Sequence, residues 1–238
     1  MFPCSVKLTQ MCSIILNITP QGVFIAANRD EMINRPWLPP ARHWADDVIA
    51  GKDETAGGTW LGFNRHGVVA AILNRHGSLG PAPGKRSRGE LPLLALAAPS
   101  AAEAASNIAK LNAGAYRSFN LVTADRDGAY IVRGLGDGAP DVAQLPPGVT
   151  MLTAGEPNDM AEPRIARHLP RFQNSDWPAW ETLLTDSAGP RLSALNIPPG
   201  AEGFGTVCSS LLELPRKGDS SWHFAAAGES FVKLNLFS

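Results

Sequence analysis

The sequence predicts an α+β fold in which antiparallel β-sheets are covered by helices. Strand pairs joined by short turns occur near both ends of the chain and in its middle, and helical segments lie between them in pairs. A doubly wound parallel sheet would instead follow each strand with a helix. Neither the phosphate-loop pattern G-x-x-x-x-G-K-[ST] nor G-x-G-x-x-G after a strand occurs, which also argues against a parallel nucleotide-binding sheet.

The first strand pair lies near the N-terminus. Segments 13–18 and 23–27 are apolar, and the turn Thr19-Pro20-Gln21-Gly22 joins them. The outer ends of an antiparallel hairpin lie side by side because the chain returns to where it started. We therefore expect Cys12, at the entrance of the first strand, to lie next to the run Asn28-Arg29-Asp30-Glu31 that follows the second strand.

The remaining elements follow from similar patterns. A second hairpin, over 59–64 and 68–74, ends on Asn74. Ser-x-x-Glu capping boxes at Ser87 and Ser100 predict the starts of two helices. The second of these helices extends over 101–111. The other predicted elements are a hairpin over 119–124 and 129–133, helical faces at 165–172 and 177–184, and a last strand pair over 206–214 and 222–227.

Length and composition fit one soluble globular domain. The chain has 238 residues, 44% of them hydrophobic and 18% charged, with a formal net charge of -1. This charge implies neither a nucleic-acid partner nor a membrane surface, and no apolar stretch approaches the roughly 20 residues of a membrane helix. Three cysteines are too few for a disulfide framework, so we expect a reducing, cytoplasmic location.

Cys12 is a candidate nucleophile. If the polypeptide begins at Cys12 because residues 1–11 are absent or removed, the thiol lies next to an α-amino group with a pKa of about 7.7 to 8.0. Such an amine can act as a general base without a histidine. In this interpretation Arg29 favours the thiolate, Asp30 orients the amine, and Asn74 donates to the oxyanion.

The same residues also have a purely structural interpretation. Cysteine is among the most buried residue types and often only fills a core. An Asn-Arg-Asp-Glu run after a strand is commonly a solvated turn with local ion pairs. Residue types and spacing leave both interpretations open for Cys12. Cys208 lies inside an apolar strand and is interpreted as a packing residue, and Cys4 as part of a tail.

Five ordered motifs add to these patterns. They are MCSIILN from residue 11, AANRDE from 26 with Arg35-Pro36 after it, GGTWLGFNRHG from 57, SRGEL from 87 and FNLVTAD from 119. Together they resemble the NRDE family, the transport and Golgi organisation protein 2 homologues, over most of the chain. The resemblance implies an αββα sandwich of the N-terminal-nucleophile hydrolase type. It also implies a start at Met11 with the methionine trimmed, so that 12–238 form the single domain.

The resemblance extends, more distantly, to the choloylglycine hydrolase and penicillin acylase group. Their site consists of an N-terminal cysteine, an arginine and an aspartate beyond the first hairpin, and an asparagine that ends the second hairpin. The residues on these positions are Cys12, Arg29, Asp30 and Asn74. Two positions depart from the pattern: Ala154 stands where those enzymes have an asparagine after a Leu-Thr pair, and Val207 where family members often have an arginine after Gly-Thr.

These residues predict a cysteine N-terminal-nucleophile hydrolase that acts on a non-peptide C–N (amide) bond of a small molecule. We expect Asn28, Trp60 and Arg88 to contact the substrate. Arg88 belongs to a basic loop over 85–88, which is either a solvated loop or a clamp for a carboxylate. Trp60 follows Gly57-Gly58, where we expect a close approach of strands.

A carrier without turnover is the alternative function. Family members are linked to haem and lipid trafficking, so the same pocket could hold haem or a lipid or acyl ligand. Haem held by its iron would need an axial His, Cys or Met. The five histidines form no H-x-x-x-H pattern and there is no C-x-x-C pair, so we expect no metal site and no resident cofactor. The sequence does not predict the oligomeric state.

Overall fold

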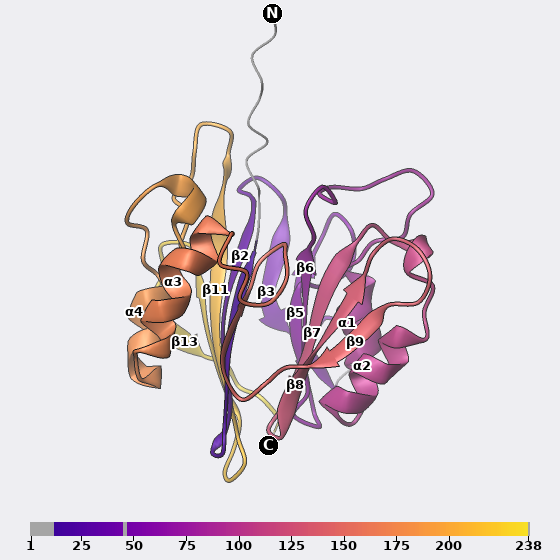
Figure 1. The fold of residues 1–238 in the computed structure, drawn as a ribbon, viewed down its shortest axis with the longest axis horizontal. Helices are drawn as coiled ribbons and strands as arrows, with labels where there is room; N and C mark the ends of the chain where they lie inside the picture. The colour runs from indigo at the N-terminus through magenta and orange to yellow at the C-terminus, as the bar shows by residue number, and fades with distance from the viewer. Residues whose placement is uncertain (1–11, 45–46, 238) are drawn as a thin grey trace, which may run out of the picture.

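Two antiparallel β-sheets lie face to face, and helices cover the outer face of each (Figure 1). The computed structural model describes residues 12–44 and 47–237. Within these residues, sheet A has six strands in the order β10-β1-β2-β11-β12-β13. Sheet B, counted over the same residues, has seven strands in the order β3-β4-β5-β6-β7-β8-β9. Every strand pair is antiparallel.

The strands of sheet A are β10 (Gly148–Leu152), β1 (Ser13–Thr19), β2 (Gly22–Met32), β11 (Phe204–Pro215), β12 (Ser221–Ala226) and β13 (Val232–Lys233). Those of sheet B are β3 (Trp37–Ala41), β4 (Val48–Asp53), β5 (Leu61–Asn64), β6 (Val69–Asn74), β7 (Phe119–Asp125), β8 (Gly128–Gly134) and β9 (Asp141–Gln144). The helices are α1 (Glu90–Ala95), α2 (Ala101–Ala109), α3 (Pro163–Gln173) and α4 (Trp180–Leu184), with short 3-10 turns at Ala113–Ala115, Trp177–Ala179 and Arg191–Ser193. None of the helices in the described part of the chain has the length and apolarity needed to cross a membrane.

Three buried clusters hold these layers together. One lies between the sheets, a second beneath α1 and α2, and a third beneath α3 and α4. The side chains of β1 belong to two of these clusters. Ile14 and Leu16 lie in the central cluster, while Ile15 packs under α3 and α4. The αββα sandwich that the resemblance implies is therefore confirmed.

β2 is longer than the sequence pattern predicts. We expected the strand to end at Ala27, with 28–31 in the following turn, but β2 continues to Met32. The reason is that β11 pairs with β2 along its whole length, so the Asn-Arg-Asp-Glu run is also paired and extended. These side chains consequently alternate between the two faces of sheet A.

The capping box predicted at Ser87 is wrong, and the one predicted at Ser100 is confirmed. α1 begins at Glu90 after Gly89 without a side-chain cap, and the hydroxyl of Ser87 accepts the N–H of Gly89 outside the helix. At the start of α2 the hydroxyl of Ser100 accepts the N–H of Glu103, as the pattern predicts.

Five strands have no counterpart in the sequence prediction. They are the short strands β3, β4, β9, β10 and β13, and β3 and β9 are the edges of sheet B. β3 contains Pro39-Pro40, which would interrupt a central strand but is tolerated at an edge, where a missing N–H need not face a neighbour.

Gly58 and Gly89 bring two backbone segments into direct contact. The N–H of Thr59 donates to the carbonyl of Gly89 over 2.8 Å, and a Cβ atom on Gly58 would lie 2.4 Å from the carbonyl carbon of Gly89. We expected a close approach between strands here. The contact is instead between Gly58, in the connection between β4 and β5, and Gly89, at the start of α1.

Gly58→Ala is expected to lower the free energy of unfolding by about 1 to 3 kcal/mol, the usual cost of extra volume in a packed site. Urea unfolding followed by circular dichroism measures this change. Gly128→Ala is the matched control, because its Cβ would lie 3.6 Å from the flexible end of Gln144, an ordinary contact. Equal effects of the two substitutions would contradict the packing argument.

Candidate active site

Cys12 lies directly before β1, at one end of the sandwich, on a pocket between the two sheets. The pocket has a volume of about 330 Å³, its open mouth included. Cys12, Arg29 and Cys208 contribute to its wall from sheet A, and Trp60 from the connection that leads into β5. Most of the other lining residues are apolar. Cysteine and arginine thus meet in one pocket, as the hairpin geometry predicts.

Cys12 belongs to a row of side chains that runs across sheet A. The β1–β2 and β1–β10 registers, extended past the start of β1, put Arg29 on one side of Cys12 and Ala154 on the other. Cys208 in turn pairs with Arg29 across β2 and β11. Strand alternation turns the side chains of Cys12, Arg29 and Cys208 toward the inside of the sandwich, whereas Ala154 lies two residues past the end of β10. The neighbour of the thiol on the β2 side of the sheet is therefore a guanidinium.

Cys12 and Cys208 are both free thiols. The whole strand β2 separates them, and adjacent strands are about 4.8 Å apart, so their Cα atoms are too distant for the roughly 7 Å limit of a disulfide. Cys208 is 2% exposed and belongs to the central cluster, which confirms it as a packing residue.

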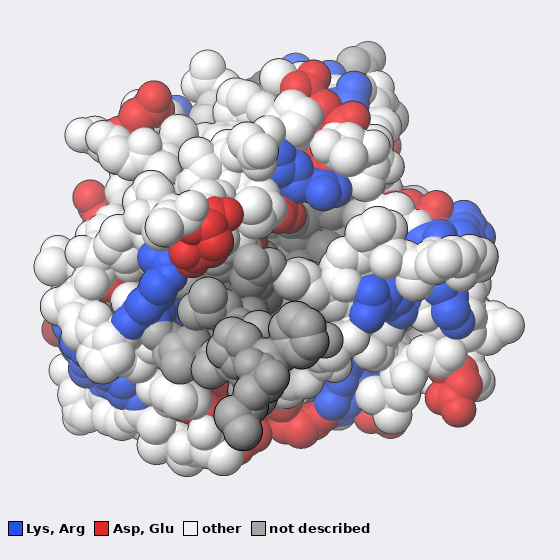
Figure 2. Space-filling model, turned by 90° about the horizontal axis from the view of Figure 1, so that it is seen from above, with Lys and Arg blue, Asp and Glu red and all other residues white. Residues whose placement is uncertain are grey.

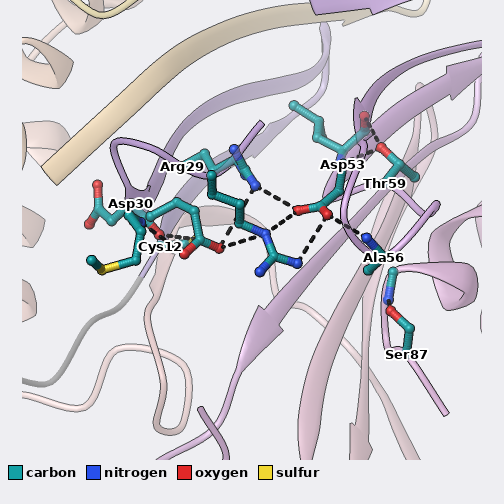
Figure 3. Close-up of polar contacts among 12 residues, drawn as sticks. Cys12, Arg29, Asp30, Asp53, Ala56, Thr59 and Ser87 are labelled. Atoms are coloured by element: carbon teal, nitrogen blue, oxygen red, sulfur yellow. Dashed lines mark hydrogen bonds and ion pairs between the residues drawn. The ribbon is translucent and has the colours of Figure 1, made fainter. Parts of the chain in front are cut away.

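Arg29 is held from two sides. Its Nη2 donates to Asp53 over 2.9 Å, and its guanidinium lies 4.3 Å from the centroid of the Trp60 ring. Asp53 also accepts from Nε of Arg35 over 2.6 Å and from the N–H of Ala56 (Figure 3). Partial burial alone would raise the pKa of Asp53, but the bonds from Arg35 and Ala56 and the nearby charges hold it below its usual range. An ionised Asp53 therefore fixes Arg29 in the pocket wall.

The surroundings of Cys12 disfavour the thiolate. The pKa of the thiol is raised to about 11, because desolvation and the charge of Asp30 together outweigh the backbone hydrogen bond to Asp30 and the charge of Arg29, which lower it. Sγ lies 3.7 Å from the backbone carbonyl oxygen of Asp30 and can donate to it (Figure 3). Arg29 alone does not produce a nucleophile, so a base is needed. The expected α-amino group, Cys4 and the removal of residues 1–11 concern a segment outside the described residues.

Asp30 faces the opposite side of sheet A from the pocket. Its buried carboxylate accepts from Nη1 of Arg164 over 2.8 Å and from the hydroxyl of Thr206 over 2.6 Å. The same nitrogen of Arg164 donates over 2.9 Å to the hydroxyl of Ser13, the residue after Cys12. Burial raises the pKa of Asp30, and Arg164 and Thr206 oppose the rise. Asp30 thus anchors β1 and β2 to α3, and its recorded contact with Cys12 runs through the backbone.

Asn28 also faces the helical layer. Its side-chain amide donates over 3.0 Å to the carbonyl oxygens of both Leu184 and Leu195, and its Oδ1 accepts from Ser209 over 2.6 Å. Both amide N–H donors are used in these bonds, so the side chain supports α4 and the segment after it. Asn28 is among the residues that line the pocket, and its expected contact with substrate stays a prediction.

Asn74 ends β6, next to Leu73 in the pocket wall. Strand alternation puts the Asn74 side chain on the face of Ile72, which packs beneath α1 and α2 and also lines the pocket. The expected oxyanion contact of Asn74 stays a prediction. The chain after Asn74 does reach the row of Cys12, because the N–H of His76 donates to the carbonyl of Ala154 over 3.2 Å.

Hydrogen bonds and an ion pair within the chain hold the basic loop over 85–88 in place. Arg88 donates through Nη1 to the carbonyl and hydroxyl of Ser78 and to the carbonyl of Ser118. Arg86 pairs with Glu90. Seen from the end at which β1 begins, Lys and Arg side chains gather on the side of the molecule that carries this loop (Figure 2). The loop is thus built mainly by internal bonds, and the expected contact of Arg88 with substrate stays a prediction.

Sequence reasoning missed Asp53, Arg164 and Thr206. Asp53 ends a strand that has no clear alternating pattern, and Arg164 precedes the apolar face of α3 without any local motif. Thr206 was placed in a predicted strand, but its role follows from a bulge in β11 between Thr206 and Cys208 that turns its hydroxyl toward Asp30. Neither the types of these three residues nor their spacing in the sequence indicates their roles.

Comparison with known families supports the motif resemblance. The family model described as Transport and Golgi organisation 2 matches residues 11–178. The chain is 34% identical over 129 residues to the Bos taurus Transport and Golgi organization protein 2 homolog, covering 48% of this chain and 45% of the relative. It is 31% identical over 155 residues to the Homo sapiens homolog, covering 58% and 55%. The chain thus spans about half the length of the curated relatives it matches.

Solved structures share the fold at low identity. A Caenorhabditis elegans ortholog of N-acylethanolamine-hydrolyzing acid amidase has a TM-score of 0.62 at 13% identity, covering 87% of this chain and 94% of the other. Penicillin V acylase from Agrobacterium tumefaciens has a TM-score of 0.60 at 15% identity, covering 94% and 86%. A conjugated bile acid hydrolase from Clostridium perfringens has a TM-score of 0.58 at 13% identity, covering 94% and 92%.

Proposed function

Because the chain belongs to the Transport and Golgi organisation 2 family and shares its fold with amidases and acylases, we propose that it is a cysteine amidohydrolase acting on a non-peptide C–N bond. The observation that carries the proposal is the position of Cys12. Its thiol lines a pocket between the sheets beside Arg29, at the point where a shortened chain would present a free α-amino group.

The reaction uses few groups. The α-amino group of Cys12 takes the thiol proton, and the thiolate attacks the amide carbonyl carbon to form a C–S bond. The C–N bond then breaks, and the leaving amine takes the proton back from the α-ammonium group. Water, deprotonated by the same amine, hydrolyses the thioester and restores the thiol. Arg29 favours the anionic sulfur, and Asp30 and Arg164 position β1 and β2 around Cys12.

Alkylation of Cys12 with iodoacetamide at pH 7.5 tests this proposal. The chain that begins at Cys12 is expected to react at least about a hundred times faster than the full chain, because a thiol with a pKa of about 11 is ionised in only about one molecule in three thousand at that pH. Peptide mass spectrometry locates the label, and Cys12→Ser and Cys208→Ala variants separate the two thiols. Equal rates for the two chains would contradict the amine-assisted mechanism.

A carrier that holds haem or an acyl compound in the same pocket stays the alternative. It is supported if Cys12 lacks this reactivity and haem titration gives a saturable absorbance shift. Either function fits the expected cytoplasmic location, because free thiols persist in a reducing compartment.

A further inference from the structure

Arg29 carries a hydrogen-bond donor that no described residue uses. The residue is 5% exposed, yet its Nη1 is buried without an acceptor in the described part of the chain. Buried side-chain donors in native proteins nearly always have a partner, and an unpaired N–H on a charged group is especially unfavourable. An acceptor for Nη1 is therefore expected to come from outside the described residues.

The pocket is the place from which that acceptor would come. Asp53 takes Nη2, and the ring of Trp60 covers one face of the guanidinium. Arg29 and Trp60 both line the pocket that holds the Cys12 thiol. Of the two terminal nitrogens of Arg29, Nη1 is therefore the one without an acceptor among the described residues.

The charge of the pocket favours an anionic acceptor. The pocket wall, as far as the described residues form it, contains Arg29 but neither aspartate nor glutamate. Glu31 lies 3.8 Å from Nη2 rather than at Nη1, and its side chain is 29% exposed. An anion inside the pocket would therefore meet the guanidinium without a competing carboxylate in the wall.

We propose that Nη1 of Arg29 binds a carboxylate of the ligand inside the Cys12 pocket. The substrate of the proposed amidohydrolase is then an amide that also carries a carboxylate close to the scissile bond. This substrate assignment rests on the proposed function, whereas the carboxylate site itself requires no turnover. The enclosed part of the pocket is small, so the part of the ligand held there is a small group.

Two alkylating reagents of nearly equal size test the site in the full chain at alkaline pH. Iodoacetate carries a carboxylate and iodoacetamide does not, and with both the Cys12 thiolate forms an S–C bond, iodide leaves, and the thiol proton goes to solvent. The quantity measured is the rate with iodoacetate divided by the rate with iodoacetamide. Because both reagents require the thiolate, this ratio is independent of the thiol pKa.

The ratio for Cys12 is expected to exceed that of N-acetylcysteine by about tenfold, the scale of one charge-assisted hydrogen bond. Arg29→Gln should return it to the N-acetylcysteine value. Arg35→Gln is the matched control, because Arg35 pairs with the same Asp53 from outside the pocket wall and should leave the ratio unchanged. A wild-type ratio equal to that of N-acetylcysteine, or an equal loss in both variants, would overturn the proposal.

A second measurement applies if Cys12 reacts with neither reagent. Sodium acetate should raise the Tm of the wild type and of Arg35→Gln above their values in sodium chloride of equal ionic strength, and should not do so for Arg29→Gln. No rise in the wild type would overturn the carboxylate site. Failure of the amidohydrolase proposal is a different result, namely equal iodoacetamide rates for the full chain and the chain that begins at Cys12.

Discussion

Arg164→Met is expected to lower the free energy of unfolding by about 3 to 5 kcal/mol, because it leaves the buried carboxylate of Asp30 without its counter-charge. The side chains of Arg164 and Asp30 are 1% and 0% exposed, so solvent cannot replace the lost partner. The same change removes the bond from Arg164 to Ser13, which supports the strand behind Cys12. Urea unfolding at pH 7 measures the loss.

Arg171→Met is the matched control for this substitution. Arg171 lies in the same helix and pairs with Asp186, but its side chain is 37% exposed, so its loss should cost no more than about 1 kcal/mol. The double variant Arg164→Met with Asp30→Asn should recover part of the lost stability, because it removes the isolated charge. A loss of less than about 1 kcal/mol for Arg164→Met alone would contradict the assigned role of the ion pair.

Ala154→Asn is expected to raise the turnover of an amide substrate by about 10²- to 10³-fold, the usual contribution of one oxyanion donor. The register of β1 and β10, continued two residues past its last pair Ile14↔Leu152, puts residue 154 across from Cys12, and the alanine side chain has no donor to offer there. The prediction rests on the proposed amidohydrolase function. The measurement is kcat with a chromogenic anilide, using the chain that begins at Cys12.

Ala154→Leu separates the donor from its volume. Leucine has the same number and branching of side-chain heavy atoms as asparagine but donates no hydrogen bond, and both changes at this buried position should cost about 1 to 3 kcal/mol of stability through overpacking. A folded Ala154→Asn protein that turns over no faster than Ala154→Leu would show that residue 154 does not face the reacting carbonyl.

The neighbourhood of Cys12 is the part of the site that the sequence predicts well. A tight turn between two apolar strands requires the start of the first to meet the end of the second, and Cys12 does lie beside Arg29. The wider αββα architecture followed from the family motifs, since hairpins alone do not indicate how two sheets pack.

The sequence does not predict on which face of sheet A each side chain lies. With the second strand ending at Ala27, Arg29 and Asp30 both seemed free to turn toward the thiol. Pairing with β11, far away in the sequence, keeps this run extended, so Arg29 enters the pocket while Asp30 turns toward α3. The partner of Asp30 is Arg164, 134 residues away, and no local pattern can identify a contact at that separation.

The most direct test of the central claim is the reaction of the chain that begins at Cys12 with p-nitrophenyl acetate, followed by absorbance and intact mass. We expect a burst of one equivalent of p-nitrophenol and one acetyl group on Cys12, which water then removes. No burst is expected when residues 1–11 remain attached or when Cys12 is replaced by alanine. A folded protein that begins at Cys12 and acquires no acetyl group there, or that reacts equally with residues 1–11 attached, would contradict Cys12 as an amine-assisted nucleophile.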